Sequence, residues 1–164
     1  MGDKKIVVFI IFLTAVILFG GVFVLSDSTN TSQVTSSTNA KAQIPQKEHN
    51  FGNIPYSGGN VEKAFIIKNV GSDTLKLSNV RTSCHCTKAR ISVDGEESPS
   101  FGMDGISSWV GEVGKSRQAK LIVTFDPAFH GPQGIGPVNR FVSVDTNDKN
   151  NSQLTFTVLG TIVK

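Results

Sequence analysis

Apolar and polar residues alternate with a period of two along much of the chain after residue 60. This period places every second side chain on the same face of an extended strand. In residues 118–125, for example, Ala119, Leu121, Val123 and Phe125 alternate with other side chains. The pattern predicts strands at residues 61–70, 75–80, 87–93, 118–125, 138–145 and 154–163, with a short extended segment at 49–52 before them.

Clusters of Gly, Asn, Asp and Pro separate these segments, as at residues 71–73, 126–127 and 146–150. Short strands with turn signals between them are typical of an antiparallel sandwich, and no stretch in this region has a helical period. We therefore expect an all-β fold over residues 47–164, an antiparallel immunoglobulin-like β-sandwich of about seven strands. Two Gly-rich stretches, residues 94–115 and 128–137, are expected to be long loops.

A different pattern occupies the start of the chain, where residues 6–25 are almost entirely apolar. A helix of about 20 such residues is long enough to cross a bilayer. Lys4 and Lys5 favour the cytoplasmic side, so residues 1–25 are predicted to form a cytoplasmic stub and a transmembrane signal-anchor. Cleavage near Ser26, which would release a secreted protein, and a buried core helix are the alternatives.

Residues 26–46 are rich in Ser, Thr, Asn and Gln and carry few apolar side chains. Such a segment buries too little apolar surface to offset the entropy lost on ordering, and it predicts a flexible tether. The expected arrangement is a single-pass protein of the cell membrane with its C-terminal domain outside the cytoplasm.

Charge and motifs limit the function classes. The chain has 16 Lys and Arg against 13 Asp and Glu, a formal net charge of +3, and no basic run interleaved with aromatic residues. Nucleic-acid binding is therefore not expected. No nucleophile elbow, zinc-protease motif or phosphate-binding glycine loop occurs, which favours a non-enzymatic protein that binds an envelope protein of unknown identity.

The densest chemistry lies in residues 82–87, which read Thr-Ser-Cys-His-Cys-Thr and contain both cysteines of the chain. In an extended strand, Cys84 and Cys86 would point to the same face and His85 to the opposite one. Their Cα atoms would then be roughly 6.5–7 Å apart at about 3.3 Å per residue. This is the long limit for a disulfide, so a bond between Cys84 and Cys86 requires a local bend.

Three interpretations of the cysteine pair stay open. The first is a disulfide, either structural or redox-active, which a location outside the cytoplasm would permit. The second is a pair of free thiols packed as small apolar side chains. The third is a soft-metal site with copper as the candidate cofactor, in which Cys84 and Cys86 are joined by Met103 and His130 from the two irregular stretches.

Several segments together resemble one bacterial family. They are the Phe-Gly opening at residues 49–55, the strand at 65–71, the segment at 75–80, the Ser-Cys-x-Cys-Thr element at 83–87 and the closing strand at 154–163. In this order they are similar to an immunoglobulin-like domain of unknown function of the DUF1573 type, over roughly residues 47–164. The resemblance implies a sandwich related to those of Hydin and major sperm proteins, which mostly bind other proteins or act as spacers. His85 stands where that family usually has glycine.

Overall fold

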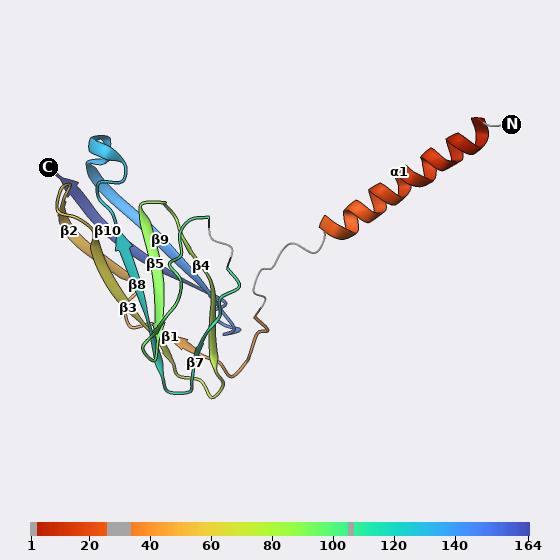
Figure 1. Cartoon of the computed structure of the whole chain (residues 1–164). Helices are drawn as coiled ribbons and strands as arrows, with labels where there is room; N and C mark the ends of the chain where they lie inside the picture. Colours follow the sequence, from red (N-terminus) through yellow and green to blue (C-terminus); the bar gives the residue numbers. More distant parts are fainter. Residues whose placement is uncertain (1–2, 26–33, 105–106) are drawn as a thin grey trace. The chain divides into compact units, whose positions relative to one another are not determined.

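The computed structural model of the chain describes residues 3–25, 34–104 and 107–164, and within the N-terminal helix it places the side chains of residues 4–17. Residues 26–33 of the predicted tether therefore lie outside the described part. The chain divides into two compact units, residues 1–30 and 31–164. The first contains the helix α1 (Asp3–Leu25), and the second contains every strand (Figure 1).

The helix α1 is almost entirely apolar after Lys5, and its large side chains from Ile6 to Ile17 are exposed. Within the part of the chain that the structure describes, however, no helix is long and apolar enough to cross a membrane. The predicted transmembrane signal-anchor is thus not found. The rest of the predicted span, residues 18–25, lies outside the described side chains.

The second unit is a sandwich of two five-stranded sheets (Figure 1). The first sheet has the order β1-β3-β8-β5-β6 and the second the order β2-β10-β9-β4-β7. The strands are β1 (Ala42–Gln43), β2 (Glu48–Pro55), β3 (Val61–Asn69), β4 (Leu75–Thr82), β5 (Thr87–Val93), β6 (Glu96–Glu97), β7 (Gly111–Val113), β8 (Gln118–Phe125), β9 (Gly136–Thr146) and β10 (Gln153–Val163).

The predicted β-sandwich is confirmed, and every predicted strand corresponds to an observed one. Two features differ from the prediction. The described residues form ten strands rather than about seven, because β1, β6 and β7 are too short to show an alternating pattern. The sandwich is also not wholly antiparallel, since β2 pairs in parallel with β10, Glu48 lying opposite Thr157. In the sequence, β2 comes early in the domain and β10 comes last, so no short hairpin joins these paired strands.

Part of the stretch expected to be an irregular loop folds as a hairpin. Val93 lies opposite Glu96, so Asp94 and Gly95 form a two-residue turn between β5 and β6. Both residues have positive φ, 51° and 93°, as a type I′ turn requires. Asp-Gly is a strong sequence signal for this turn. The strand that follows it, residues 96–97, is not predicted because two residues are too few to show an alternating pattern.

The sandwich also begins earlier than the predicted residue 47. Ser37 exchanges backbone hydrogen bonds with the β9–β10 turn, from its N–H to Asn147 (2.7 Å) and to its C=O from Lys149 (3.2 Å). Ala40 is fully buried in the main core, and Ala42 and Ile44 pack against that core. The second half of the polar segment is therefore ordered by backbone pairing and a few small apolar side chains, which composition alone does not reveal.

The main core lies between the inward faces of the two sheets, where the alternating apolar residues meet. Phe65 of β3 and Phe156 of β10 are almost fully buried, and their ring centroids are 5.2 Å apart. A second, smaller cluster of Ile54, Cys86, Phe125 and Ile162 is also buried. The alternation predicted the main core, and the second cluster places one of the two cysteines inside the fold.

A buried carboxylate holds the start of the domain to the β9–β10 turn. Asp148 is 2% exposed and accepts hydrogen bonds of 2.9 Å from the backbone N–H groups of Ala42 and Asn150 and from the side chain of Asn151. Burial by itself would raise the pKa of Asp148, but these hydrogen bonds outweigh it and lower the pKa from its ordinary value.

We predict that Asp148→Asn destabilises the domain at pH 7 by about 2 kcal/mol, because an amide group then faces donors that now have an acceptor. The native pKa of Asp148 lies below the unfolded value. Its stabilisation is therefore present above about pH 4 and lost as the pH falls through the lower native pKa. Denaturant unfolding of both proteins at several pH values measures this, and the difference between them should shrink in acid.

Glu112→Gln is the matched control, because Glu112 is exposed and its ion pair with Lys76 spans 3.5 Å. An exposed pair of this kind contributes little, so the control should lose less than about 1 kcal/mol at any pH. A difference between wild type and Asp148→Asn that stays constant down to pH 2 would contradict the assignment of the stabilisation to the ionised carboxylate.

Candidate functional site

The two cysteines lie in the turn that joins β4 of one sheet to β5 of the other. The Thr82 hydroxyl lies 3.0 Å from the carbonyl oxygens of Cys84 and Thr87, and the Thr87 N–H donates to the Cys84 oxygen over 3.1 Å. Thr82 and Thr87 are buried, so these bonds are shielded from water. They supply the bend that a bond between the cysteines requires.

Cys84 and Cys86 are joined by a disulfide, with Cα atoms 5.2 Å apart. This separation is shorter than the extended value expected from the sequence and lies within the usual range for disulfides. The Cys86 N–H points back at the Cys84 sulfur, 3.3 Å away. No free cysteine exists among the described residues, so in this structure the pair is oxidised.

The two sulfur atoms have different surroundings. Cys86 is 2% exposed and packs in the second cluster, whereas Cys84 lies at the edge of that cluster and is half-buried. Arg140 of β9 donates from its Nε to the Cys86 Sγ over 3.1 Å. The guanidinium also lies 6.0 Å from the centre of the Phe125 ring and donates to the carbonyl of Asn139. The inner sulfur therefore faces a fixed positive charge.

The outer sulfur faces a histidine. His130 Nε2 lies 3.3 Å from Cys84 Sγ. The ring contacts Phe129 edge to face, with centroids 5.0 Å apart, and both side chains are exposed. His130 immediately precedes the short 3-10 helix η1 (Gly131–Gly134), at which Gly131 takes a positive φ of 70°. This turn between β8 and β9 positions the imidazole beside the disulfide.

His85 and Met103 are both exposed, His85 within the turn that carries the disulfide and Met103 on the stretch beside it. His85, between the cysteines, points its Nε2 toward the carboxylate of Asp104 at 3.4 Å, and both side chains are largely exposed. Met103 is 47% exposed on the neighbouring stretch, whose Gly102 carbonyl accepts a hydrogen bond from the Thr82 N–H. The structure thus brings Cys84, Cys86 and His130 together, and a role for Met103 as a ligand stays a prediction.

Sequence reasoning missed Arg140. The alternation of β9 puts Arg140 on the same face as Val138, Val142 and Val144, which is the face toward the interior. A charged side chain at an inward position requires a partner, because an unpaired buried charge is costly. That position was the available signal, but the sequence cannot tell that the partner is a sulfur atom from the turn at residues 83–86.

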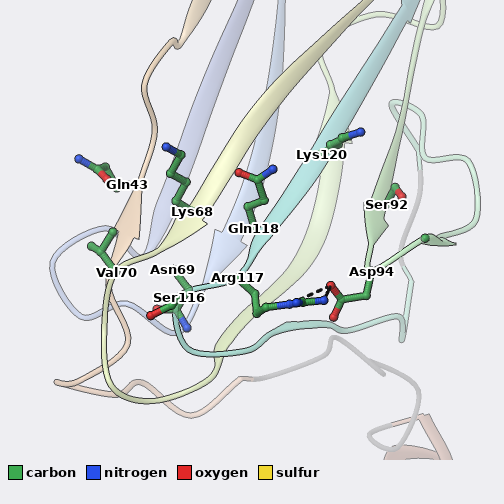
Figure 2. A pocket seen from close by; sticks show the side chains of 11 residues that line it. Gln43, Lys68, Asn69, Val70, Ser92, Asp94, Ser116, Arg117, Gln118 and Lys120 are labelled. Atoms are coloured by element: carbon green, nitrogen blue, oxygen red, sulfur yellow. Dashed lines mark hydrogen bonds and ion pairs between the residues drawn. The ribbon is translucent and has the colours of Figure 1, made fainter.

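A polar hollow lies at the end of β8 away from the disulfide, where β3, β5 and β8 approach the β7–β8 turn (Figure 2). Its lining is polar, and it includes Lys68, Lys120 and the exposed ion pair between Arg117 and Asp94. The lysine side chains are exposed, so water already solvates their charges. The described residues that line this hollow include no sulfur and no buried charged side chain, so it offers no chemistry comparable to that of the disulfide.

Comparisons with known proteins identify the fold and leave its activity open. The model of a family described as a protein of unknown function (DUF1573) matches residues 42–97, a segment that includes the disulfide turn. No curated protein matches the chain. Similar solved structures include a protein of unknown function from Porphyromonas gingivalis W83, with a TM-score of 0.58 and 18% identity over 78% of this chain and 49% of that one. This chain thus spans about half the length of that protein.

Two further solved structures are similar to this chain over about three-quarters or more of its length. One is a family 123 glycoside hydrolase from Clostridium perfringens, with a TM-score of 0.52 and 12% identity over 76% of this chain and 27% of that one. The other is the ASH/PapD-like domain 7 of human CEP192, with a TM-score of 0.47 and 18% identity over 80% of this chain and 91% of that one. At such low identities the likeness concerns the fold alone. The chain is an immunoglobulin-like β-sandwich that matches a family of unknown function over its first strands.

Proposed function

We propose that this protein is a non-enzymatic, immunoglobulin-like binding module of the cell envelope, and that it binds a soft metal ion of the copper(I) kind. One observation carries the proposal. The ligand atoms of Cys84, Cys86 and His130 all lie within 4.8 Å of one another. Two thiolates and an imidazole form a donor set that suits Cu(I), and suits Zn(II) less well.

The distances support binding by the reduced form. Metal–sulfur and metal–nitrogen bonds of roughly 2.3 and 2.0 Å place the two donors about 3.5 Å apart on a tetrahedral ion. His130 Nε2 and Cys84 Sγ are already 3.3 Å apart. Reduction breaks the bond between the sulfurs and lets them separate to the roughly 3.8 Å that two sulfur ligands need. The disulfide is then the metal-free, oxidised state of the same site.

Met103 is the fourth ligand in this proposal. It lies next to Gly102, whose carbonyl is hydrogen-bonded to Thr82 at the start of the disulfide turn. A thioether is a soft ligand that matches the two thiolates. Met103 is 47% exposed, and its thioether is the ligand that the proposal adds to the three atoms that lie together.

The cellular location is also a proposal. Disulfides persist in oxidising compartments and are rare in the cytosol, so the bond between Cys84 and Cys86 supports a domain outside the cytoplasm. The apolar side chains that α1 exposes between Ile6 and Ile17 support attachment of the N-terminal unit to a membrane.

The metal proposal predicts that the reduced full-length chain withdraws Cu(I) from a chromogenic chelator with a stoichiometry of one. Cys84→Ser and Cys86→Ser should each weaken the affinity by at least 100-fold, because each removes a thiolate. His130→Ala should weaken it by about tenfold or more, and Met103→Leu by less. The competition titration is read from the absorbance of the chelator complex under anaerobic conditions.

His85→Ala is the matched control, because His85 lies between the cysteines in sequence but pairs with Asp104. Its affinity for Cu(I) should equal that of the wild type. Equal, weak binding by wild type, Cys84→Ser and His130→Ala would overturn the proposal, as would a loss in His85→Ala as large as that in His130→Ala.

The location predicts that a maleimide that cannot cross membranes labels the protein in intact cells after brief treatment with a reductant. The double variant Cys84→Ser, Cys86→Ser should stay unlabelled and serves as the control. Without reductant, labelling should be absent, because both thiols are in the disulfide. Labelling of the wild type only after cell lysis would place the domain in the cytoplasm and contradict the proposal.

A further inference from the structure

The disulfide is exposed to an incoming group from one side only. Cys84 is half-buried at the surface, and the exposed His130 ring is its neighbour, whereas Cys86 is 2% exposed beneath it. A thiolate that attacks a disulfide displaces the other sulfur as a thiolate. The difference in burial therefore favours attack on the Cys84 sulfur and departure of the Cys86 sulfur.

Arg140 is placed to receive the negative charge that such an attack creates. Its Nε lies 3.1 Å from Cys86 Sγ. No carboxylate forms an ion pair with Arg140 in the described part of the chain, in contrast to Arg90 and Arg117. Arginine keeps its charge at all ordinary pH values. A half-buried guanidinium whose charge is directed at a sulfur atom stabilises the thiolate form of that sulfur more than the disulfide form.

We propose that Cys84 and Cys86 undergo directional thiol–disulfide exchange with a dithiol of a partner protein. A thiolate of the partner attacks Cys84 Sγ, the bond between Cys84 and Cys86 breaks, and Cys86 leaves as a thiolate beside Arg140. The second thiolate of the partner then attacks the partner's sulfur in the mixed disulfide and releases Cys84. The disulfide of this chain gains two electrons, the partner dithiol is oxidised to a disulfide, and its two thiol protons pass to solvent.

Two exposed aromatic side chains mark the surface around Cys84. Phe129 is 51% exposed and contacts His130, which contacts Cys84. Phe141 is 45% exposed, and its backbone is hydrogen-bonded in both directions to Ser83, the residue before Cys84. Exposed aromatic residues of this kind are typical contacts for a protein partner. They fit a partner that presents its dithiol within an apolar segment.

This inference goes beyond metal binding and does not require it, because it rests on the charge and accessibility of the two sulfurs. If both hold, exchange supplies the reduced form that the metal site needs. The two can fail separately: metal binding is measured on protein that has already been reduced, and exchange is measured without any metal.

The first test determines which sulfur reacts. Single variants of the full-length chain, Cys86→Ser and Cys84→Ser, are mixed with the chromogenic disulfide of 5-thio-2-nitrobenzoate. The free Cys84 thiol of the first variant should form the mixed disulfide at least tenfold faster than the free Cys86 thiol of the second. Equal rates, or faster reaction of Cys86, would overturn the direction of exchange.

The second test measures the role of Arg140 by the equilibrium of each protein with reduced and oxidised dithiothreitol. Arg140→Gln should make the disulfide about tenfold harder to reduce, which corresponds to roughly 30 mV in reduction potential. Arg140→Lys keeps the positive charge and should recover most of this loss. Arg117→Gln is the control, because Arg117 has the same charge at the opposite end of β8, and its equilibrium should match the wild type.

Thermal unfolding of each variant shows whether it is folded, and the Arg140→Lys protein keeps the test informative where Arg140→Gln fails to fold. An Arg140→Gln equilibrium within twofold of that of Arg117→Gln would overturn the role of the guanidinium. For a folded Arg140→Lys protein, an equilibrium more than tenfold away from the wild type would overturn it as well.

Discussion

The site depends on the way the chain passes from one sheet to the other between Thr82 and Thr87. At the start of this crossing, the Ser83 N–H donates a hydrogen bond to the carbonyl of Phe141 in β9. At its end, the Cys86 carbonyl accepts a hydrogen bond from the N–H of Asp126, which follows β8. Both ends of the turn are therefore fixed to different sheets. The buried threonines hold the backbone between them in a bend. This bend brings the sulfurs together and turns the outer one toward the β8–β9 loop.

Much of the fold could be predicted from the sequence, since alternation is a local property and the longer strands show it clearly. The strands of residues 87–93 and 118–125 have the same bounds in the structure. The site could be predicted only in part. Cys84 and Cys86 are neighbours in sequence, but His130 and Arg140 reach them over sequence separations of 46 and 54 residues. Such contacts follow from the order of strands in the sheets, which no periodic pattern specifies.

The disulfide adds little to the stability of the fold in entropic terms. A loop closed by residues 84 and 86 restricts the unfolded chain by about 1.6 kcal/mol, compared with about 3 kcal/mol for a loop of 15 residues. The crossing is also held by hydrogen bonds that do not involve sulfur. A small contribution to stability, an accessible outer sulfur and a charged neighbour at the inner one together agree better with a reactive bond than with a structural one.

The parallel pairing of β2 with β10 has a mechanical consequence. The N-terminal end of β2 at Glu48 lies opposite Thr157, and its C-terminal end at Pro55 lies opposite Val163. A force that pulls on the start of β2 and on the end of β10 acts at opposite ends of this ladder. It therefore shears all the hydrogen bonds of the pair at once and does not unzip them one at a time. The β2–β10 pair is thus arranged to resist tension applied between the start of β2 and the end of β10.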